Sequence, residues 1–288
     1  MDKLKNVARK AFAVIRATRR RLETPPTVID DPRDAIALRR KGLSVALECP
    51  IDDCVIFNGM SFSNRGFHPF AAAAEELHVC PDQTYEGSSL QTYYERWQPS
   101  DALDALIGAR AGPQALRAYP SYLMLAPWLD VSIEERLAWI RNTMCWESKS
   151  VGETGLGPED GHGLQGPVSA RKGAAEFERL RCVLASIKAR GYNRGEGDLA
   201  AQILVREDEF RYRIVHGHHR AGALQALGAR HLIVQPSAII SLEDLDRWRH
   251  VRSGTWSRAE AEVYFHHHFD FDSGAWARSR GLGGLLDR

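Results

Sequence analysis

A glycine turn followed by basic residues is the stretch of this sequence best suited to chemistry. Residues 214–228 read Ile-Val-His-Gly-His-His-Arg-Ala-Gly-Ala-Leu-Gln-Ala-Leu-Gly, which predicts a strand, a turn at Gly217 and then a helix. The first turn of that helix carries His218, His219 and Arg220. A helix N-terminus presents unpaired N–H groups and the positive end of the helix dipole. The sequence therefore predicts an anion site here, and phosphate is the anion that fits it best.

Regular elements on either side of the turn are expected to hold it in place. A helix is predicted to begin at Ser169 and to end at Gly191, because apolar residues recur on one face between a capping residue and a stop signal. The strands predicted from alternating apolar residues are 201–205, 210–215 and 231–234. We therefore expect a small α/β unit over residues 167–240.

This order of elements resembles the ParB N-terminal/sulfiredoxin superfamily. The residues that carry the likeness are 179–187 (Arg-Leu-Arg-Cys-Val-Leu-Ala-Ser-Ile) and 212–220 (Tyr-Arg-Ile-Val-His-Gly-His-His-Arg). The likeness extends over 167–240, roughly a quarter of the chain. It implies an α/β (α+β) fold, with a small mixed sheet and helices, that binds the phosphates of ATP or CTP at a Gly-x-x-Arg turn. Such a likeness is more informative about fold than about chemistry.

The resemblance assigns phosphate contacts to five residues of this chain. Gly217, His219 and Arg220 occupy the turn itself. Arg179 and Ser186 fall where the family has a phosphate-contacting lysine and threonine, and both retain a hydrogen-bond donor. The implied ligand is ATP or another nucleotide, bound together with Mg²⁺.

The residue at position 218 separates this chain from two branches of the family. Sulfiredoxins have their reactive cysteine where this chain has His218, which excludes sulfiredoxin chemistry. ParB proteins have Gly-Glu-Arg-Arg at the turn and a helix-turn-helix DNA reader downstream, and the sequence has neither. The turn is nearer to that of the free-serine kinases. The flanking residues 166–169 and 186–192 are similar to members found with surface-polysaccharide genes.

Phosphoryl transfer also needs a proton acceptor close to the phosphates. A histidine such as His218 titrates in a useful range. Glu176, Glu178 and Asp198 are near the turn-bearing unit in sequence, and each is a candidate base or Mg²⁺ ligand. The spacing does not choose among these four residues. In the simpler interpretation both histidines of the turn only pack the helix, and the arginine forms a structural salt bridge.

Three functions compete for this pattern. The first is an ATP-dependent phosphotransferase of kinase type that acts on a small hydroxyl compound, such as a sugar or amino acid of the cell envelope. The second is a ParB-like switch, in which a nucleotide controls partner binding. The third is a nuclease or nucleic-acid-binding protein, which the net charge of +1 argues against over the surface as a whole.

Residues 1–23 are predicted to form a separate basic amphipathic helix. The Pro-Pro pair after Thr24 ends this helix. Three roles stay open for it: binding an anionic membrane surface, binding nucleic acid, or packing on the body of the protein. The sequence has no apolar run of membrane-spanning length and no secretory signal. The five scattered cysteines are typical of free thiols. We expect a cytoplasmic protein, located at the inner face of the membrane if this helix binds lipid.

The rest of the chain divides into three segments. Residues 24–150 predict a mixed α/β region whose aromatic residues belong mainly to the core. Residues 151–166 contain six glycines and predict a linker, or alternatively a lid over a site. Residues 241–288 predict helices, one of which begins at the capping box Ser257–Glu260. In that helix His266–His268 is expected to be an ordinary surface or core segment and not a metal site.

Overall fold

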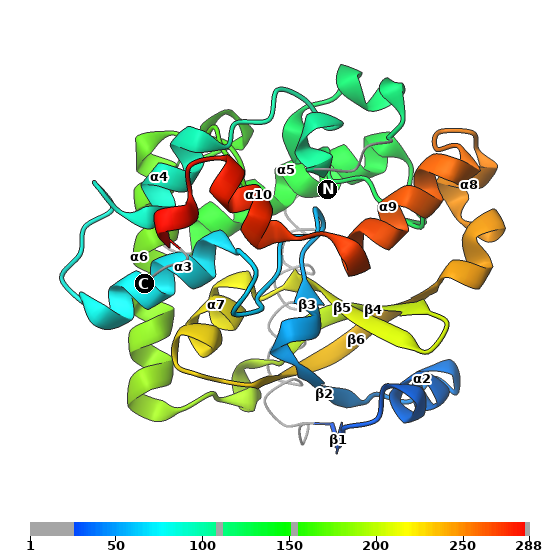
Figure 1. Ribbon diagram of the computed structural model, residues 1–288, viewed down its shortest axis with the longest axis horizontal. Helices are drawn as coiled ribbons and strands as arrows, with labels where there is room; N and C mark the ends of the chain where they lie inside the picture. The colour runs from blue at the N-terminus through cyan, green and yellow to red at the C-terminus, as the bar shows by residue number, and fades with distance from the viewer. Residues whose placement is uncertain (1–25, 108–111, 151–154, 286–288) are drawn as a thin grey trace, which may run out of the picture.

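The protein folds around a six-stranded mixed sheet. The computed structural model describes residues 26–107, 112–150 and 155–285, and its ribbon is drawn in Figure 1. Across the sheet the strands run in the order β1-β2-β6-β4-β5-β3. The strands are β1 (Val28–Ile29), β2 (Ala46–Pro50), β3 (Cys54–Val55), β4 (Leu199–Arg206), β5 (Glu209–His216) and β6 (His231–Ser241).

The pairing of the strands joins two segments that are far apart in the sequence. β4 and β5 form an antiparallel hairpin, and β6 runs parallel to β4. β2 then pairs antiparallel with β6, and β3 pairs parallel with β5. Strands from residues 24–150 therefore extend both edges of the unit expected over 167–240. The predicted mixed α/β fold is confirmed, and its sheet is shared by the two segments.

Helices cover both faces of this sheet. The α-helices are α2 (Pro32–Arg40), α3 (Pro69–Val79), α4 (Ser89–Arg96), α5 (Ile133–Ser150), α6 (Ala170–Arg190), α7 (His218–Ala226), α8 (Arg249–Arg252), α9 (Arg258–Asp270) and α10 (Ser273–Ser279). The short 3-10 helices are Ile51–Asp53, Asp104–Leu106, Gln114–Ala118, Ser121–Leu123, Pro158–Asp160, Arg194–Glu196, Leu242–Arg247 and Gly283–Leu285.

The two faces of the sheet bury separate apolar cores. Side chains alternate along β4, so Ala201 and Ile203 lie in the first core and Leu204 lies in the second. Helices α3, α6 and α7 contact one another over the first core and lie together on the left of Figure 1. The second core lies beneath α8 and α9, where Trp128 and Trp248 meet edge to face at 5.2 Å. Trp128 therefore belongs to the core, as the sequence predicts for most aromatic residues of 24–150.

Local signals in the sequence set the ends of the helices that matter for the site. Ser169 caps α6, because its side chain accepts a hydrogen bond from the N–H of Lys172 at 3.1 Å. Gly191 ends the same helix with φ +75°, a conformation that favours glycine. The capping box at Ser257–Glu260 is also present at the start of α9. These three predictions are confirmed.

The glycine-rich segment differs from the expected linker over the part that is described, residues 155–166. Leu164 and Gly166 are buried. The hydroxyl groups of Tyr93 and Tyr94 donate hydrogen bonds to the carbonyls of Leu164 and Gly163, at 2.7 and 2.6 Å. Small residues let this backbone approach α4 closely, so it forms part of the body of the protein.

Residues 1–23, with the predicted basic helix, lie outside the described residues. Among the described helices, none has both the length and the apolar composition that a membrane span requires. The five cysteines are free, as expected, and the Sγ atoms of Cys49 and Cys54 lie 3.7 Å apart in the first core.

Candidate functional site

Two neighbouring cavities share residues of α6 and of the first turn of α7. The large cavity has a volume of about 720 Å³ and lies where β5 ends and α7 begins, with walls from α5, α6 and the segment 162–164. The small cavity, of about 440 Å³, lies between α6 and the segment 190–193. Arg179, Val183 and Arg220 line both cavities. A ligand that spans the two must therefore pass two arginines.

Gly217 makes the sharp turn that places α7 at this junction. Its φ is +92°, in the left-handed region, and an added Cβ atom would lie 2.7 Å from Cδ2 of Leu199. Gly217 has no side chain that could cap α7, so the first N–H groups of this helix are not used by a capping residue. The turn and the helix follow the sequence prediction.

The cations predicted to hold phosphate lie around this turn. The guanidinium of Arg220 donates a hydrogen bond to the carbonyl of Gly197 and forms no ion pair with a described carboxylate. Arg179 projects from α6 into the junction and forms no ion pair within the described part of the chain. Ser186 lies further along α6 in the small cavity, where its Oγ accepts a hydrogen bond from Arg190 at 2.6 Å. Arg179, Ser186 and Arg220 are thus brought together around the small cavity.

A buried ion-pair cluster joins α6 to the first turn of α7. His219 Nε2 lies 2.8 Å from Glu176 Oε2, and Lys172 forms an ion pair with the other oxygen of the same carboxylate. The ring of His219 also stacks on Phe70 at 4.0 Å. Burial by itself would raise the pKa of the Glu176 carboxyl, but the contacts with His219 and Lys172 outweigh it and hold that pKa well below its usual range. Glu176 is therefore an ionised positioning group.

His218 and His162 line the large cavity and are neutral there. Burial, reinforced by the neighbouring His219 and other positive groups, lowers the pKa of His218 to about 3. Burial and the charge of Lys172 lower the pKa of His162 to about 4. Nδ1 of His218 is buried and has no hydrogen-bond partner among the described residues. A neutral imidazole with a free ring nitrogen is able to accept a proton or a hydrogen bond.

The other two candidate carboxylates are placed differently. Glu178 lines the small cavity, but its side chain is largely exposed and forms an ion pair with Arg181 at 3.1 Å. Asp198 lines neither cavity, and its buried carboxylate accepts two hydrogen bonds from Arg194, at 2.8 and 2.9 Å. Of the three carboxylates, only Glu176 lines the large cavity.

Three residues that sequence reasoning did not single out line the large cavity. Arg136 and Trp139 come from α5, and the guanidinium of Arg136 lies 4.8 Å from the centre of the Trp139 ring. Arg213 comes from β5 and is 4% exposed. Trp139 is 57% exposed, which is unusual for tryptophan. The sequence signal for Arg136 and Trp139 is their spacing of three residues in a predicted helix, which places both side chains on one face.

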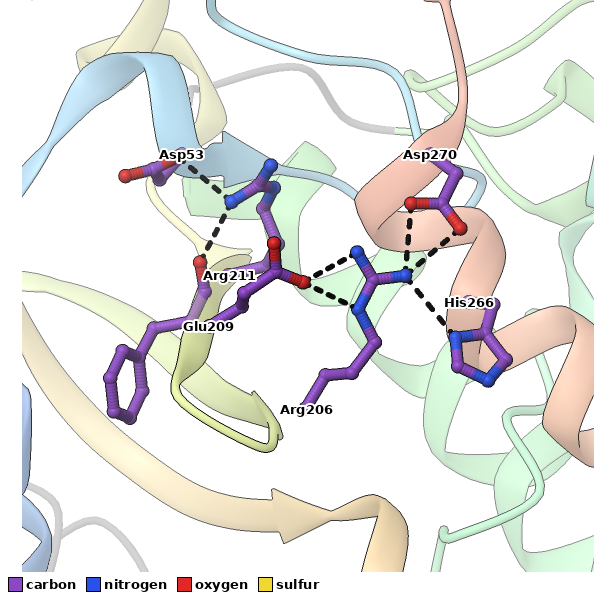
Figure 2. Close-up of polar contacts among 7 residues, drawn as sticks. Asp53, Arg206, Glu209, Arg211, His266 and Asp270 are labelled. Carbon is purple, nitrogen blue, oxygen red and sulfur yellow. Dashed lines mark hydrogen bonds and ion pairs between the residues drawn. The ribbon is translucent and has the colours of Figure 1, made fainter.

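The described residues contain no group of three or more His, Cys, Asp or Glu side chains placed to hold a metal ion. Figure 2 shows the polar contact of His266, the first histidine of the run in α9. His266 Nδ1 lies 3.2 Å from Nη1 of Arg206. This Nη1 also donates hydrogen bonds to the Asp270 carboxylate. His267 and His268 bind the backbone carbonyls of Asn58 and Tyr264 instead. All three histidines of the run are therefore engaged by other groups of the protein.

Comparison of the chain with protein-family models, curated proteins and solved structures gave no match.

Proposed function

We propose that the protein is a nucleotide-dependent phosphotransferase that moves the terminal phosphoryl group of ATP to a hydroxyl group of a small acceptor. The observation that carries this proposal is the junction of the two cavities at Arg179 and Arg220. Two guanidinium groups beside an uncapped helix N-terminus suit a polyphosphate. The nucleotide would occupy the small cavity, and the acceptor would occupy the large one.

In this reaction the acceptor oxygen forms a bond to the terminal phosphorus atom while the bond from phosphorus to the bridging oxygen breaks. ADP leaves with the electron pair of that bond. Arg179 and Arg220 stabilise the charge on the phosphoryl oxygens. The proton of the acceptor hydroxyl passes to His218, which is neutral before the ligands bind. The negative charge of the bound phosphates raises the pKa of that imidazole and so favours the transfer.

The carboxylates take different parts in this proposal. Glu176 holds His219 in place through the 2.8 Å contact and stays ionised throughout. The described residues do not form a ready cage for Mg²⁺, since Glu176 is already paired and Glu178 and Asp198 lie elsewhere. An Mg²⁺ ion would therefore bind mainly through the phosphates of the nucleotide.

Formation of ADP from ATP in the presence of a panel of sugars and hydroxy amino acids tests the proposal. We expect acceptor-dependent ADP formation that Arg220→Met and His218→Asn reduce by at least tenfold. Arg252→Met is the matched control, because Arg252 is exposed at the end of α8 and lines neither cavity. ATP binding without transfer to any acceptor would favour the ParB-like switch.

We also propose that residues 1–23 hold the protein at an anionic membrane surface, where acceptors of cell-envelope polysaccharide synthesis are available. The support is the run of basic residues at helical spacing beside an apolar face. Sedimentation with anionic liposomes tests this for the full chain and for residues 24–288. Equal recovery of both in the supernatant would reject membrane binding.

A further inference from the structure

Arg213 is a buried cation with unused hydrogen-bond donors. It lies in β5, opposite Gln202 of β4, on the face of the sheet that forms the second core. Its Nε and Nη1 atoms are buried and have no hydrogen-bond partner among the described residues. The guanidinium lies 5.4 Å from the centre of the Trp128 ring and is also in contact with the hydroxyl of Tyr264. Buried donors without a partner are costly, so their position at a cavity favours a ligand that accepts hydrogen bonds there.

A second arginine of the same cavity adds to this positive charge. Arg136 is half-buried, and its Nε donates a hydrogen bond to the carbonyl of Leu123 at 3.4 Å. Burial, followed by the charge of Arg213, lowers the pKa of Arg136 to about 10. Among the described residues that line the large cavity, Glu176 is the single carboxylate, and Lys172 and His219 already pair with it. Two positive charges therefore face the cavity without a counter-ion from the described residues.

We propose that Arg213 and Arg136 form a site for the dianionic phosphate of a phosphate monoester, so that the acceptor is itself a phosphorylated small molecule. A phosphate monoester carries a charge of about −1.5 to −2 near neutral pH, which matches two arginines. A ligand with a single carboxylate would leave the charge of one of these arginines uncompensated. A guanidinium also presents its donors in a fork that fits phosphate oxygens.

This site is separate from the one proposed for the nucleotide. Arg179 and Arg220 lie at the junction and line both cavities, whereas Arg136 and Arg213 line only the large cavity. That the bound anion belongs to the acceptor rests on the proposed phosphotransferase function. The proposal that phosphate binds at Arg213 is independent of that function.

Inorganic phosphate is the probe, and the unfolding temperature at constant ionic strength is the readout. The Arg179→Met/Arg220→Met protein lacks the cations proposed for the nucleotide. We expect phosphate to raise its unfolding temperature, and we expect a further Arg213→Met change to abolish that shift. Arg213→Lys keeps the charge without the fork, so it should weaken phosphate binding on the order of tenfold. A shift that survives Arg213→Met, or no shift in the double variant, would overturn the site.

The stability of Arg213→Met without phosphate separates a binding role from a structural one. Removing a buried charge that lacks a counter-ion should leave the protein at least as stable as the wild type. An unfolded or strongly destabilised variant would overturn the proposal. An equal Arg213-dependent shift with acetate would overturn the assignment to phosphate in favour of a carboxylate. Loss of ATP binding with the phosphate shift retained would reject the phosphotransferase alone.

Discussion

His219 Nε2 lies 2.8 Å from Glu176 Oε2, and this contact fixes the first turn of α7 against α6. Lys172 holds the second oxygen of the same carboxylate. The three side chains are nearly buried, with 13%, 6% and 8% of their surfaces exposed. A carboxylate that the sequence offers as a candidate base thus has its charge fully engaged in orienting a histidine of the proposed phosphate site.

Glu176→Gln should therefore be strongly destabilising. The change leaves the Lys172 charge buried without its counter-ion, a loss of about 3–5 kcal/mol in the free energy of unfolding. Urea denaturation measures it. Glu178→Gln is the matched control on the same helix, because its exposed ion pair with Arg181 is worth less than about 1 kcal/mol. Similar small losses for both variants would contradict the role given to the buried cluster.

Gly217→Ala should impair both folding and ligand binding. A methyl group there meets Leu199 at 2.7 Å, in addition to the strain of φ +92°. Gly228→Ala is the control, since Gly228 has φ +81° but open space around an added Cβ. We expect a loss of about 1–2 kcal/mol for the control and a larger loss for Gly217→Ala, measured by denaturant unfolding. Equal losses of unfolding free energy in the two variants would show that Leu199 moves away from the added methyl group without destabilising the protein.

The buried imidazole of His218 should make the protein less stable in mild acid. In the unfolded chain this group takes up a proton near pH 6.5, whereas in the folded protein its pKa is lowered to about 3. The unfolded state therefore binds more protons below about pH 6.5, and stability falls as the pH is lowered. One such group lowers the free energy of unfolding by about 2 kcal/mol between pH 7 and pH 5.

His218→Asn checks this by removing the titrating group. Its unfolding free energy should fall by about 2 kcal/mol less than that of the wild type over the same interval. The difference between the two proteins should stay constant at higher pH, where the imidazole is neutral in both states. Parallel curves down to about pH 5 would mean that His218 is not held neutral by burial.

The parts of the site that the sequence predicts are those encoded locally. Gly217 carries the turn, and Ser169 and Gly191 mark the ends of α6 through the chemistry of capping residues. The spacing that puts Arg179 and Ser186 on α6 also follows from a single helix. All of these features depend on residues within a few positions of one another.

The parts that the sequence does not predict depend on contacts between distant segments. Arg213 alternates with Tyr212 and Ile214, so the pattern of β5 places it on a face that is usually exposed to solvent. That face is instead covered by Trp128 and Tyr264, from other parts of the chain. The pairing of Asp198 with Arg194 likewise requires the folded geometry.

Calorimetric titration of ATP at fixed ionic strength tests the central claim most directly. We predict that the wild type binds ATP and that Arg179→Met and Arg220→Met each weaken binding by at least about tenfold, or 1.4 kcal/mol. The exposed control Arg252→Met should bind as the wild type does. Absence of ATP binding by the folded wild type, or unchanged affinity in both junction variants, would contradict a nucleotide site at this junction.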